Sequence, residues 1–189
     1  MSSPLECWAI IPASGIGLRM QADRPKQYLP LGNKTILEHT LDNLLSHIAV
    51  TGVVLILHPE DDYWASLNYQ HEKPILLCDG GVQRCDSVFL GLSRLKNTLN
   101  RDAIVLIHDA VRPFVQHEDI NNLLQVLKDC EDGALLAAPV ADTLKFSSSD
   151  NSVAYTQSRE QLWRAFTPQA FRLDSIYSAL KRVIDEKLA

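Results

Sequence analysis

Short apolar runs recur along the chain and are bounded by polar or turn-forming residues. Three to five consecutive apolar residues are typical of a strand that is buried on both faces of a sheet. Five such runs are predicted as strands, at Trp8–Ile11, Val53–Leu57, Ile75–Leu77, Ile104–Ile107 and Ala134–Ala138. Because these runs lack alternating polar positions, we expect other elements to cover both sides of the sheet.

Between these runs, apolar residues recur three and four positions apart, which is the spacing of one face of an α-helix. Thr35 and Glu38 have the spacing of a capping box and mark the start of the first helix. Helices are predicted around Ile36–Leu45, Val88–Leu95, Ile120–Leu127 and Ile176–Val183. Strands that alternate with helices predict an α/β fold with a mostly parallel sheet, helices on both faces, and ligands outside the carboxyl ends of the strands.

One stretch departs from this alternation. Residues Lys145–Ser158 are polar and rich in Ser, Asn and Asp, with Val153 and Tyr155 as the apolar candidates for a hairpin. We expect a β-arm over residues 142–159 that projects from the core. The chain as a whole has 189 residues, of which 46% are hydrophobic, and this predicts a single globular domain over 1–189.

Charge and cysteine content narrow the range of partners. The chain has 18 Lys and Arg against 23 Asp and Glu, a formal net charge of −5, so a broad nucleic-acid-binding face is not expected. The four cysteines form no CxxC pair and have no zinc-ligand spacing with histidine, which argues against a metal knuckle or a disulfide framework. The apolar run Cys7–Ala13 follows no basic stretch and is too short for a signal segment or a membrane span. These features predict a cytosolic protein that does not bind membranes.

The first predicted strand leads into a glycine-rich segment, Pro12–Met20. Gly15 and Gly17, with small neighbouring side chains, would let backbone N–H groups approach phosphate oxygens closely. The segment lacks the Gly-Lys-Ser/Thr end of a Walker A loop, and Met20 stands where a dinucleotide-binding fingerprint has its third glycine, which argues against a dinucleotide-dependent dehydrogenase. On these residues alone, a phosphate cradle and a plain strand-to-helix turn both stay open.

Three basic residues, Arg19, Arg24 and Lys26, lie within and directly after the glycine-rich segment. They occur close together in a chain whose net charge is negative. Pro25 and Lys26 are expected in a loop, where a cluster of bases is less ordinary than on a solvated helical face. The cluster therefore favours a local anion-binding site.

Two further polar segments follow predicted strands and should reach the same crevice. Asp109 comes two residues after the strand at Ile104–Ile107, and Mg²⁺ is usually held by one or two carboxylates plus substrate phosphates. Asp109 is therefore a candidate metal ligand, directly or through water; otherwise it caps backbone N–H groups or pairs with Arg112. The segment Asp79–Ser87 places glycines, a base and a hydroxyl beside the crevice, where Ser87 could equally serve as the N-cap of the next helix.

Six sequence segments follow these strands in a recognisable order: PASGIGLRM, PKQYLPLG with TILEHT, DGGVQRCDSV, HDAVRP, APVADTLK and TPQAF. Together they resemble the 2-C-methyl-D-erythritol 4-phosphate cytidylyltransferase family, and the resemblance runs from Trp8 to Phe171. It implies a Rossmann-like nucleotidyltransferase fold, CTP bound with Mg²⁺ at the glycine-rich loop, and a homodimer joined by the arm. The implied enzyme transfers CMP from CTP to methylerythritol phosphate, with release of pyrophosphate, in non-mevalonate isoprenoid synthesis.

The same resemblance implies roles for individual residues. Arg19 and Lys26 correspond to the catalytic basic pair around the reacting phosphates, and Asp109 corresponds to the acidic residue of the site. The CTP-binding positions, including the cytosine pocket, correspond to Ala13, Ser14, Gly15, Gly17, Gly81, Val82 and Ser87. The positions that hold methylerythritol phosphate correspond to Arg112, Thr143 and Arg159, of which the last two reach in from the partner subunit.

Two alternatives stay open. Ribitol-5-phosphate cytidylyltransferases share the KQ, HDAVRP and TPQ segments, although APVADTLK and residues 159–163 are more similar to the methylerythritol enzyme. Family members usually continue past the position of Ala189, through an acidic Thr-Asp motif, a strand and a helix, and a late basic residue there contacts the substrate phosphate. We therefore expect a C-terminal segment to be missing from these 189 residues, which leaves a non-catalytic CTP-binding module as the second alternative.

Overall fold

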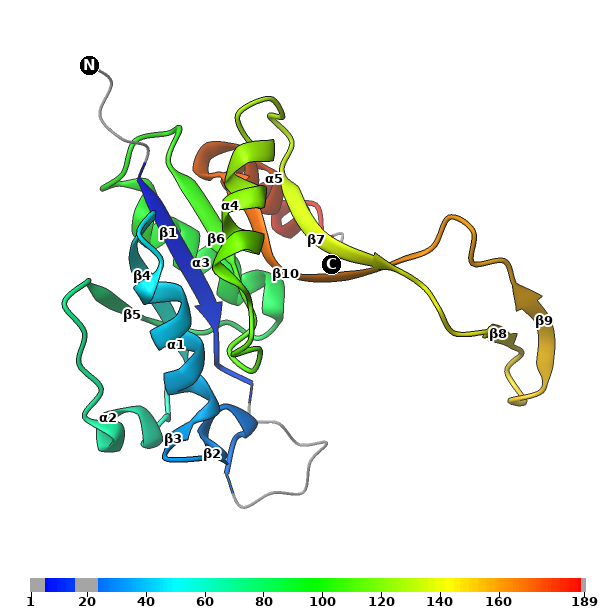
Figure 1. Cartoon of the computed structure of the whole chain (residues 1–189), viewed down its shortest axis with the longest axis horizontal. Coiled ribbons are helices and arrows are strands. Elements are labelled where there is room, and N and C mark those ends of the chain that lie inside the picture. The colour runs from blue at the N-terminus through cyan, green and yellow to red at the C-terminus, as the bar shows by residue number, and fades with distance from the viewer. Residues whose placement is uncertain (1–5, 16–23, 188–189) are drawn as a thin grey trace.

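A six-stranded sheet in the order β5-β4-β1-β6-β10-β7 runs through the computed structural model, which describes residues 6–15 and 24–187 (Figure 1). Its strands are β1 (Cys7–Pro12), β4 (Val50–Leu57), β5 (Ile75–Asp79), β6 (Ile104–Ile107), β7 (Ala134–Pro139) and β10 (Trp163–Arg172). Neighbours β5, β4, β1 and β6 pair in parallel. The five predicted strands and the mostly parallel sheet are confirmed.

The apolar pattern does not predict β10. This strand pairs antiparallel with both β6 and β7, with Ala170 opposite Leu106. Pro168 lies within it, and its register with β7 shifts between Ala165 and Gln169. A proline lacks the N–H that a central strand needs for its hydrogen bonds, so its presence argues against a strand in the sequence. Only the pairing with two neighbours makes this segment a strand.

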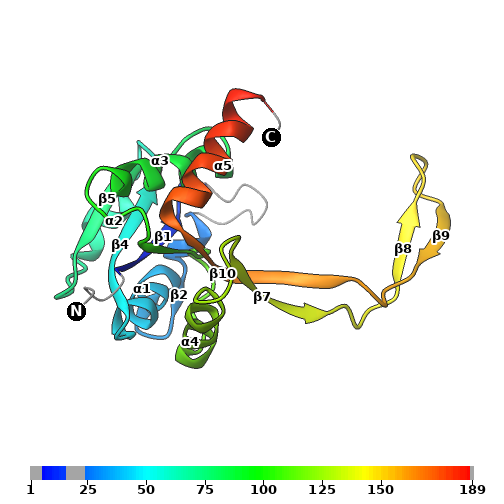
Figure 2. The ribbon, with the colours of Figure 1, turned by 90° about the horizontal axis from the view of Figure 1, so that it is seen from above.

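Four helices cover the two faces of the sheet (Figure 2). One face carries α1 (Ile36–Ser46) and α4 (His117–Val126), and the other carries α3 (Arg84–Lys96) and α5 (Leu173–Asp185). Alternate side chains of β1 enter the two cores, because Ile11 packs on the α1 face and Ile10 on the α3 face. Burial of each such side chain stabilises the fold by about 1.5–3 kcal/mol. The predicted helices on both faces are confirmed.

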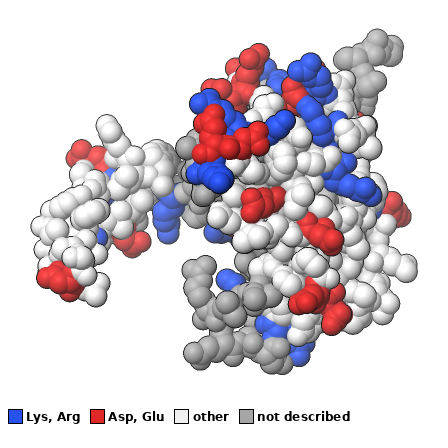
Figure 3. Space-filling view, turned by 180° about the vertical axis from the view of Figure 1, so that it is seen from behind, with Lys and Arg blue, Asp and Glu red and all other residues white. Residues whose placement is uncertain are grey.

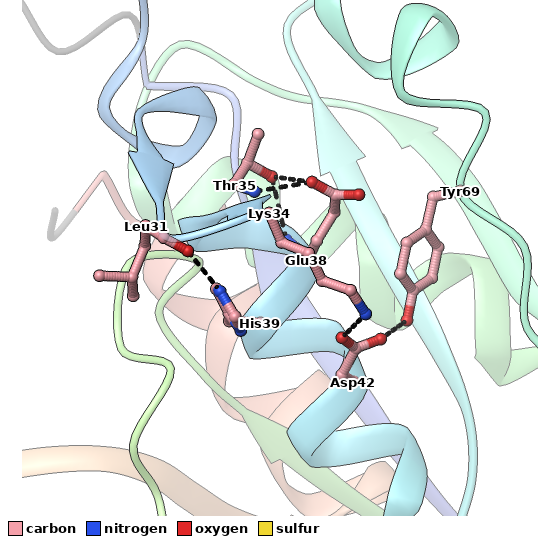
Figure 4. Close-up of polar contacts among 7 residues, drawn as sticks. All are labelled: Leu31, Lys34, Thr35, Glu38, His39, Asp42 and Tyr69. Atoms are coloured by element: carbon pink, nitrogen blue, oxygen red, sulfur yellow. Dashed lines mark hydrogen bonds and ion pairs between the residues drawn. The ribbon is translucent and has the colours of Figure 1, made fainter.

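Shorter elements lie in the connections between the strands. The 3₁₀ turn η2 (Lys26–Tyr28) and the hairpin strands β2 (Pro30–Leu31) and β3 (Lys34–Thr35) lie between β1 and α1, and the short helix α2 (Tyr63–Leu67) lies between β4 and β5. The predicted capping box at the start of α1 is confirmed: Glu38 N donates to Thr35 Oγ1 at 3.2 Å, and Thr35 N donates to the Glu38 carboxylate at 2.7 Å (Figure 4). The loop expected at Pro25 and Lys26 contains a short 3₁₀ turn, which begins at Lys26.

A hairpin of β8 (Leu144–Ser147) and β9 (Val153–Gln157) forms a separate two-stranded sheet. It lies at the end of the ribbon formed by β7 and β10, away from the core (Figures 1 and 2). Phe146 and Tyr155 stack with ring centroids 4.9 Å apart, yet they stay 55% and 50% exposed. An isolated two-stranded hairpin is at best marginally stable in water. The arm therefore presents apolar surface that the core of its own chain leaves uncovered.

Charged side chains are interspersed over the face shown in Figure 3, where Lys and Arg lie among Asp and Glu. Within residues 6–15 and 24–187, no helix is long and apolar enough to cross a membrane. The cytosolic location stays a prediction.

Candidate active site

A cavity of about 450 Å³ opens at the carboxyl ends of β1, β4 and β5. Its lining residues are Pro12, Ser14, Gly15, His58, Gly81, Val82, Gln83 and Arg84. Pro12 ends β1, His58 follows β4, and the residues from Gly81 to Arg84 lead from β5 into α3. The cavity thus lies where a parallel α/β sheet is expected to bind its ligand.

Ser87, buried in the first turn of α3, ties the two glycine-containing segments together. Its Oγ lies 3.2 Å from Ser14 Oγ, accepts a hydrogen bond from Gly81 N at 3.1 Å and donates one to Gln83 O at 3.1 Å. Gln83 is the N-cap of α3, so the alternative N-cap role for Ser87 is wrong. The fold brings three predicted CTP-site residues, Ser14, Gly81 and Ser87, into one cluster.

Close approach of the two segments requires glycine at position 80. A Cβ there would lie 2.4 Å from Ser14 Cβ, far inside the contact distance of two carbons. Gly80 N also donates to Leu57 O at 2.7 Å, which fixes the segment to the end of β4. Val82 follows with its side chain 99% exposed at the cavity. An apolar side chain is therefore available to a ligand at this point.

Ala13, near the start of the glycine-rich segment, and Lys26, which follows that segment, are linked through Gln27. Ala13 is buried, and its N–H donates to Ile56 O at 2.7 Å. Its carbonyl accepts a hydrogen bond from Gln27 Nε2 at 2.6 Å, and Gln27 directly follows Lys26. The structure therefore holds the turn that begins at Lys26 against the end of β1. Two predicted site residues, Gly17 and Arg19, lie outside the described residues.

Asp109 lies beyond β6 between two arginines. Its Oδ1 accepts from Arg84 Nη2 and its Oδ2 from Arg112 Nε, each at 2.8 Å. Burial raises the pKa of Asp109, but the hydrogen bonds from the two guanidinium groups outweigh this effect and hold the pKa below its ordinary value of 3.8. Asp109 is therefore a carboxylate at neutral pH. Its pairing with Arg112 was one of the predicted alternatives, whereas its pairing with Arg84 was not predicted.

A second cavity, of about 400 Å³, begins at Arg112. Its lining includes His108, Val111, Arg112, Phe114, Phe166 and Thr167. The Arg112 guanidinium carbon lies 6.0 Å from the centroid of the Phe166 ring, and Asp109 N donates to Thr167 Oγ1 at 3.2 Å. Because Arg84 lines the first cavity and Arg112 the second, the ion pairs through Asp109 connect the two cavities.

The described residues contain no group of three or more His, Cys, Asp or Glu side chains that could hold a metal ion. Asp109 is the carboxylate between the two cavities. A carboxylate has about four lone-pair positions, of which two accept from the arginines, so Asp109 can still offer an oxygen to a cation. One carboxylate with substrate phosphates is a usual Mg²⁺ environment. Asp109 thus fits an Mg²⁺ ion that a nucleotide largely carries.

Thr143 and Arg159 lie at the base of the arm, just before β8 and just after β9. Both side chains are exposed, and Arg159 donates to Ala141 O across the base. The ribbon of β7 and β10 leads this part of the chain away from the core (Figure 1). A single chain therefore does not bring these two residues together with Asp109 and Arg112.

Some site residues were not singled out from the sequence: His58, Gln83 and Arg84 at the first cavity, and Thr167 beside Asp109. The available signal was their position. His58 directly follows the predicted strand Val53–Leu57, and Gln83 and Arg84 belong to the segment predicted to reach the crevice. Thr167 had no such position, because β10 was not predicted, but it is the first residue of the TPQAF segment that contributes to the family resemblance.

Comparison with known proteins supports a family assignment. A sequence model of the 2-C-methyl-D-erythritol 4-phosphate cytidylyltransferase family matches residues 7–188. A relative of that name from Ectopseudomonas mendocina (strain ymp) is 46% identical over 175 residues, covering 92% of this chain and 74% of the relative. A second, from Pseudomonas syringae pv. tomato, is 49% identical over 174 residues, with coverage of 92% and 74%. The crystal structure of the Francisella tularensis protein of that name has a TM-score of 0.82 at 33% identity, covering 97% of this chain and 80% of that chain.

Proposed function

This chain belongs to the 2-C-methyl-D-erythritol 4-phosphate cytidylyltransferase family, and we propose that its two adjoining cavities bind the two substrates of that transfer. It is a CTP-using cytidylyltransferase of isoprenoid synthesis. The reaction joins the phosphate of methylerythritol phosphate to the α-phosphorus of CTP and releases pyrophosphate. The observation that most supports the proposal is the chain of ion pairs Arg84–Asp109–Arg112, which connects the cavities beyond the ends of the strands.

The first cavity suits CTP. Its volume of about 450 Å³ falls in the range typical of small-molecule sites, roughly 300–1,000 Å³. The hydroxyl of Ser14 lines the cavity and can donate to or accept from the edge of a pyrimidine base. The buried Ser87 hydroxyl lies 3.2 Å behind it, and the exposed Val82 side chain offers apolar contact. Small residues at Ala13 and Gly81 allow the nucleotide to approach the backbone. The proposed CTP site therefore consists of the predicted positions, joined by His58 and Gln83.

The chemistry requires no strong base. A phosphate monoester has its second pKa near ~6, so methylerythritol phosphate is largely a dianion at neutral pH and already a nucleophile. The barrier comes from the approach of two anions, and cations must neutralise the charge that spreads over the transferring phosphoryl group. We assign this role to Lys26 and Arg19, in keeping with the sequence resemblance. Arg84 and Arg112 add positive charge at the junction of the cavities.

Mg²⁺ is the proposed cofactor, and Asp109 is the residue that would hold it. When bound, the ion would neutralise phosphate charge and help to align the phosphates for displacement. Arg84 and Arg112 keep Asp109 ionised and fix the orientation of its carboxylate. Their hydrogen bonds therefore prepare an anionic ligand at the junction of the two cavities.

The second cavity, beginning at Arg112, is the proposed site for methylerythritol phosphate. A guanidinium group matches the geometry of a phosphate, and Arg112 offers one beside Phe166. We propose that Thr143 and Arg159 of the partner subunit complete this site in a homodimer. The arm over 142–159 would form the dimer contact, since Phe146 and Tyr155 leave apolar surface uncovered. Each active site would then use residues of two chains.

A pyrophosphate-release assay tests the proposed function. The chain is mixed with CTP and Mg²⁺, with methylerythritol phosphate in one tube and ribitol 5-phosphate in a parallel tube. We expect release with methylerythritol phosphate alone. Release with ribitol 5-phosphate alone would overturn the substrate assignment. Binding of CTP without release in either tube would indicate a non-catalytic CTP-binding module.

A further inference from the structure

Gln27 is a buried amide between the proposed phosphate-binding lysine and the core. Gln27 is only 5% exposed and directly follows Lys26 in the turn η2. Its Nε2 donates to the carbonyl of Ala13 at 2.6 Å. A buried amide that loses its partner incurs a large desolvation penalty, so this hydrogen bond holds the turn in a defined place.

The acceptor, Ala13, is itself held by the core of the protein. Ala13 is 3% exposed, and its N–H donates to Ile56 O at 2.7 Å at the end of β4. The hydrogen bond to Ala13 therefore fixes Gln27 relative to the central sheet, because Ala13 directly follows β1. Ala13 also lies near the start of the glycine-rich segment. The same carbonyl group fixes the end of β1 and the start of η2 relative to each other.

Other contacts anchor the residues that follow Gln27. Tyr28 is buried, donates to the Asp61 carboxylate at 2.9 Å and stacks on Tyr63 with ring centroids 5.2 Å apart. Farther along, the hairpin is tied to α1, where Leu31 O lies 2.7 Å from His39 Nε2 and Lys34 Nζ donates to Asp42 at 2.5 Å (Figure 4). These contacts do not depend on Gln27. Loss of the Gln27 hydrogen bond would therefore release the start of the turn and leave the rest in place.

We propose that Gln27 is a positioning residue that sets the place of Lys26 relative to Ala13 and hence to the phosphates of CTP. The inference rests on the proposed role of Lys26. A lysine ammonium stands on a flexible four-carbon stem, so its placement depends on the backbone that carries it. Misplacement of a catalytic group by about 1 Å can cost roughly 10²-fold in rate. Gln27 acts through Lys26 and does not touch the substrate.

A double-mutant cycle with Gln27→Met and Lys26→Ala tests this inference. Gln27→Met keeps the length of the side chain but removes the donor, and we expect it to lower kcat by about 10- to 10²-fold. In the Lys26→Ala background, the same substitution should change kcat less than about twofold, because the group that it positions is gone. Gln125→Met, on the exposed face of α4, is the matched control and should leave kcat unchanged.

The outcomes separate this inference from the proposed function. Equal loss of kcat in both backgrounds would overturn it, as would wild-type kcat in Gln27→Met when Lys26→Ala is impaired. Wild-type kcat in Lys26→Ala would refute the role of Lys26, and the positioning role would fall with it. If Gln27→Met does not fold, Gln27→Glu replaces it. A carboxyl donates to Ala13 O only when it is protonated, so its kcat relative to wild type should rise as the pH falls, and a constant ratio would contradict the proposal.

Discussion

At the scale of residues, three side chains determine the charge at the junction of the two cavities. Two guanidinium groups, from Arg84 and Arg112, face the one carboxylate of Asp109, so the cluster carries excess positive charge. Because the arginines lower the pKa of Asp109, its carboxylate is ionised throughout the neutral range. A cluster of this kind attracts phosphates and still presents an anion to a metal ion.

Replacing Lys26 with alanine removes one of the cations proposed to stabilise the transferring phosphoryl group. We expect turnover to fall by at least ~10²-fold, the scale found when one preorganised charge-stabilising donor is lost. Pyrophosphate release under saturating substrates measures it. Lys128→Ala, which alters an exposed lysine in the turn after α4, serves as the control and should keep normal turnover. Near-normal turnover in Lys26→Ala would refute its role.

Thr143→Val removes a hydroxyl proposed to contact the alcohol phosphate alone. We expect the KM for methylerythritol phosphate to rise about tenfold, as for the loss of one hydrogen bond to a charged group, with the KM for CTP unchanged. Thr98→Val, beyond the end of α3, is a control of the same chemistry. An unchanged KM for the alcohol phosphate would remove Thr143 from the site.

Parallel strands bring the site together at the scale of elements. Because β1, β4, β5 and β6 run in the same direction, the segments that follow them meet at one edge of the sheet. Strand β10 runs in the opposite direction, so it reaches this edge through Thr167, in its interior, whereas its start leads out to the arm. The antiparallel strand thus links the crevice to the proposed dimer contact.

Phe146→Glu places a charge on the exposed apolar surface of the arm. If a second chain covers this surface, burial of an unpaired carboxylate should convert the dimer into monomers and reduce activity with it. Analytical ultracentrifugation and pyrophosphate release measure the two effects. Val126→Glu, a half-exposed apolar residue on α4, is the matched control. A variant that stays dimeric would show that the arm is not the dimer contact.

Burial of a histidine in the packed molecule predicts that the stability of the protein depends on pH. His47 is buried between α1 and α4, where Nδ1 accepts from Ala49 N and Nε2 lies 3.2 Å from Asn121 Oδ1. Burial lowers the pKa of His47 below its ordinary value of 6.5 and outweighs the hydrogen bond with Asn121, which raises it; the charges of His117 and Lys73 lower it as well. The neutral form is therefore the one that the fold accommodates.

The free energy of unfolding should consequently fall as the pH drops below 6.5, the ordinary pKa of His47. In that window the unfolded chain binds more protons than the folded chain, so stability rises with pH. Urea unfolding at about pH 7.5 and pH 5.5 measures the change, which His47→Gln should reduce. His71→Gln, which alters an exposed histidine, should leave the change as it is in the wild type. An equal change in His47→Gln would exclude His47 as its source.

The sequence by itself determined the alternation of strands and helices and which segments lie at the crevice. Short apolar runs predict strands, and the capping box at Thr35 predicts the start of a helix. Both patterns depend on neighbouring residues in the chain and need no distant contact. The positions of Ser14, Gly81 and Asp109 directly after strands were enough to place them at one edge of the sheet. The order of short motifs was sufficient to indicate the family.

Only the tertiary structure decided which residues meet across the chain. Strand β10 exists because β6 and β7 supply hydrogen-bonding partners on both sides, and the local sequence around Pro168 does not favour a strand. The ion pair of Arg84 with Asp109 and the hydrogen bond of Gln27 to Ala13 join residues from different segments. Such pairs depend on strand order and on packing, which no local pattern encodes, because the free energy of a contact depends on the distance between groups in space.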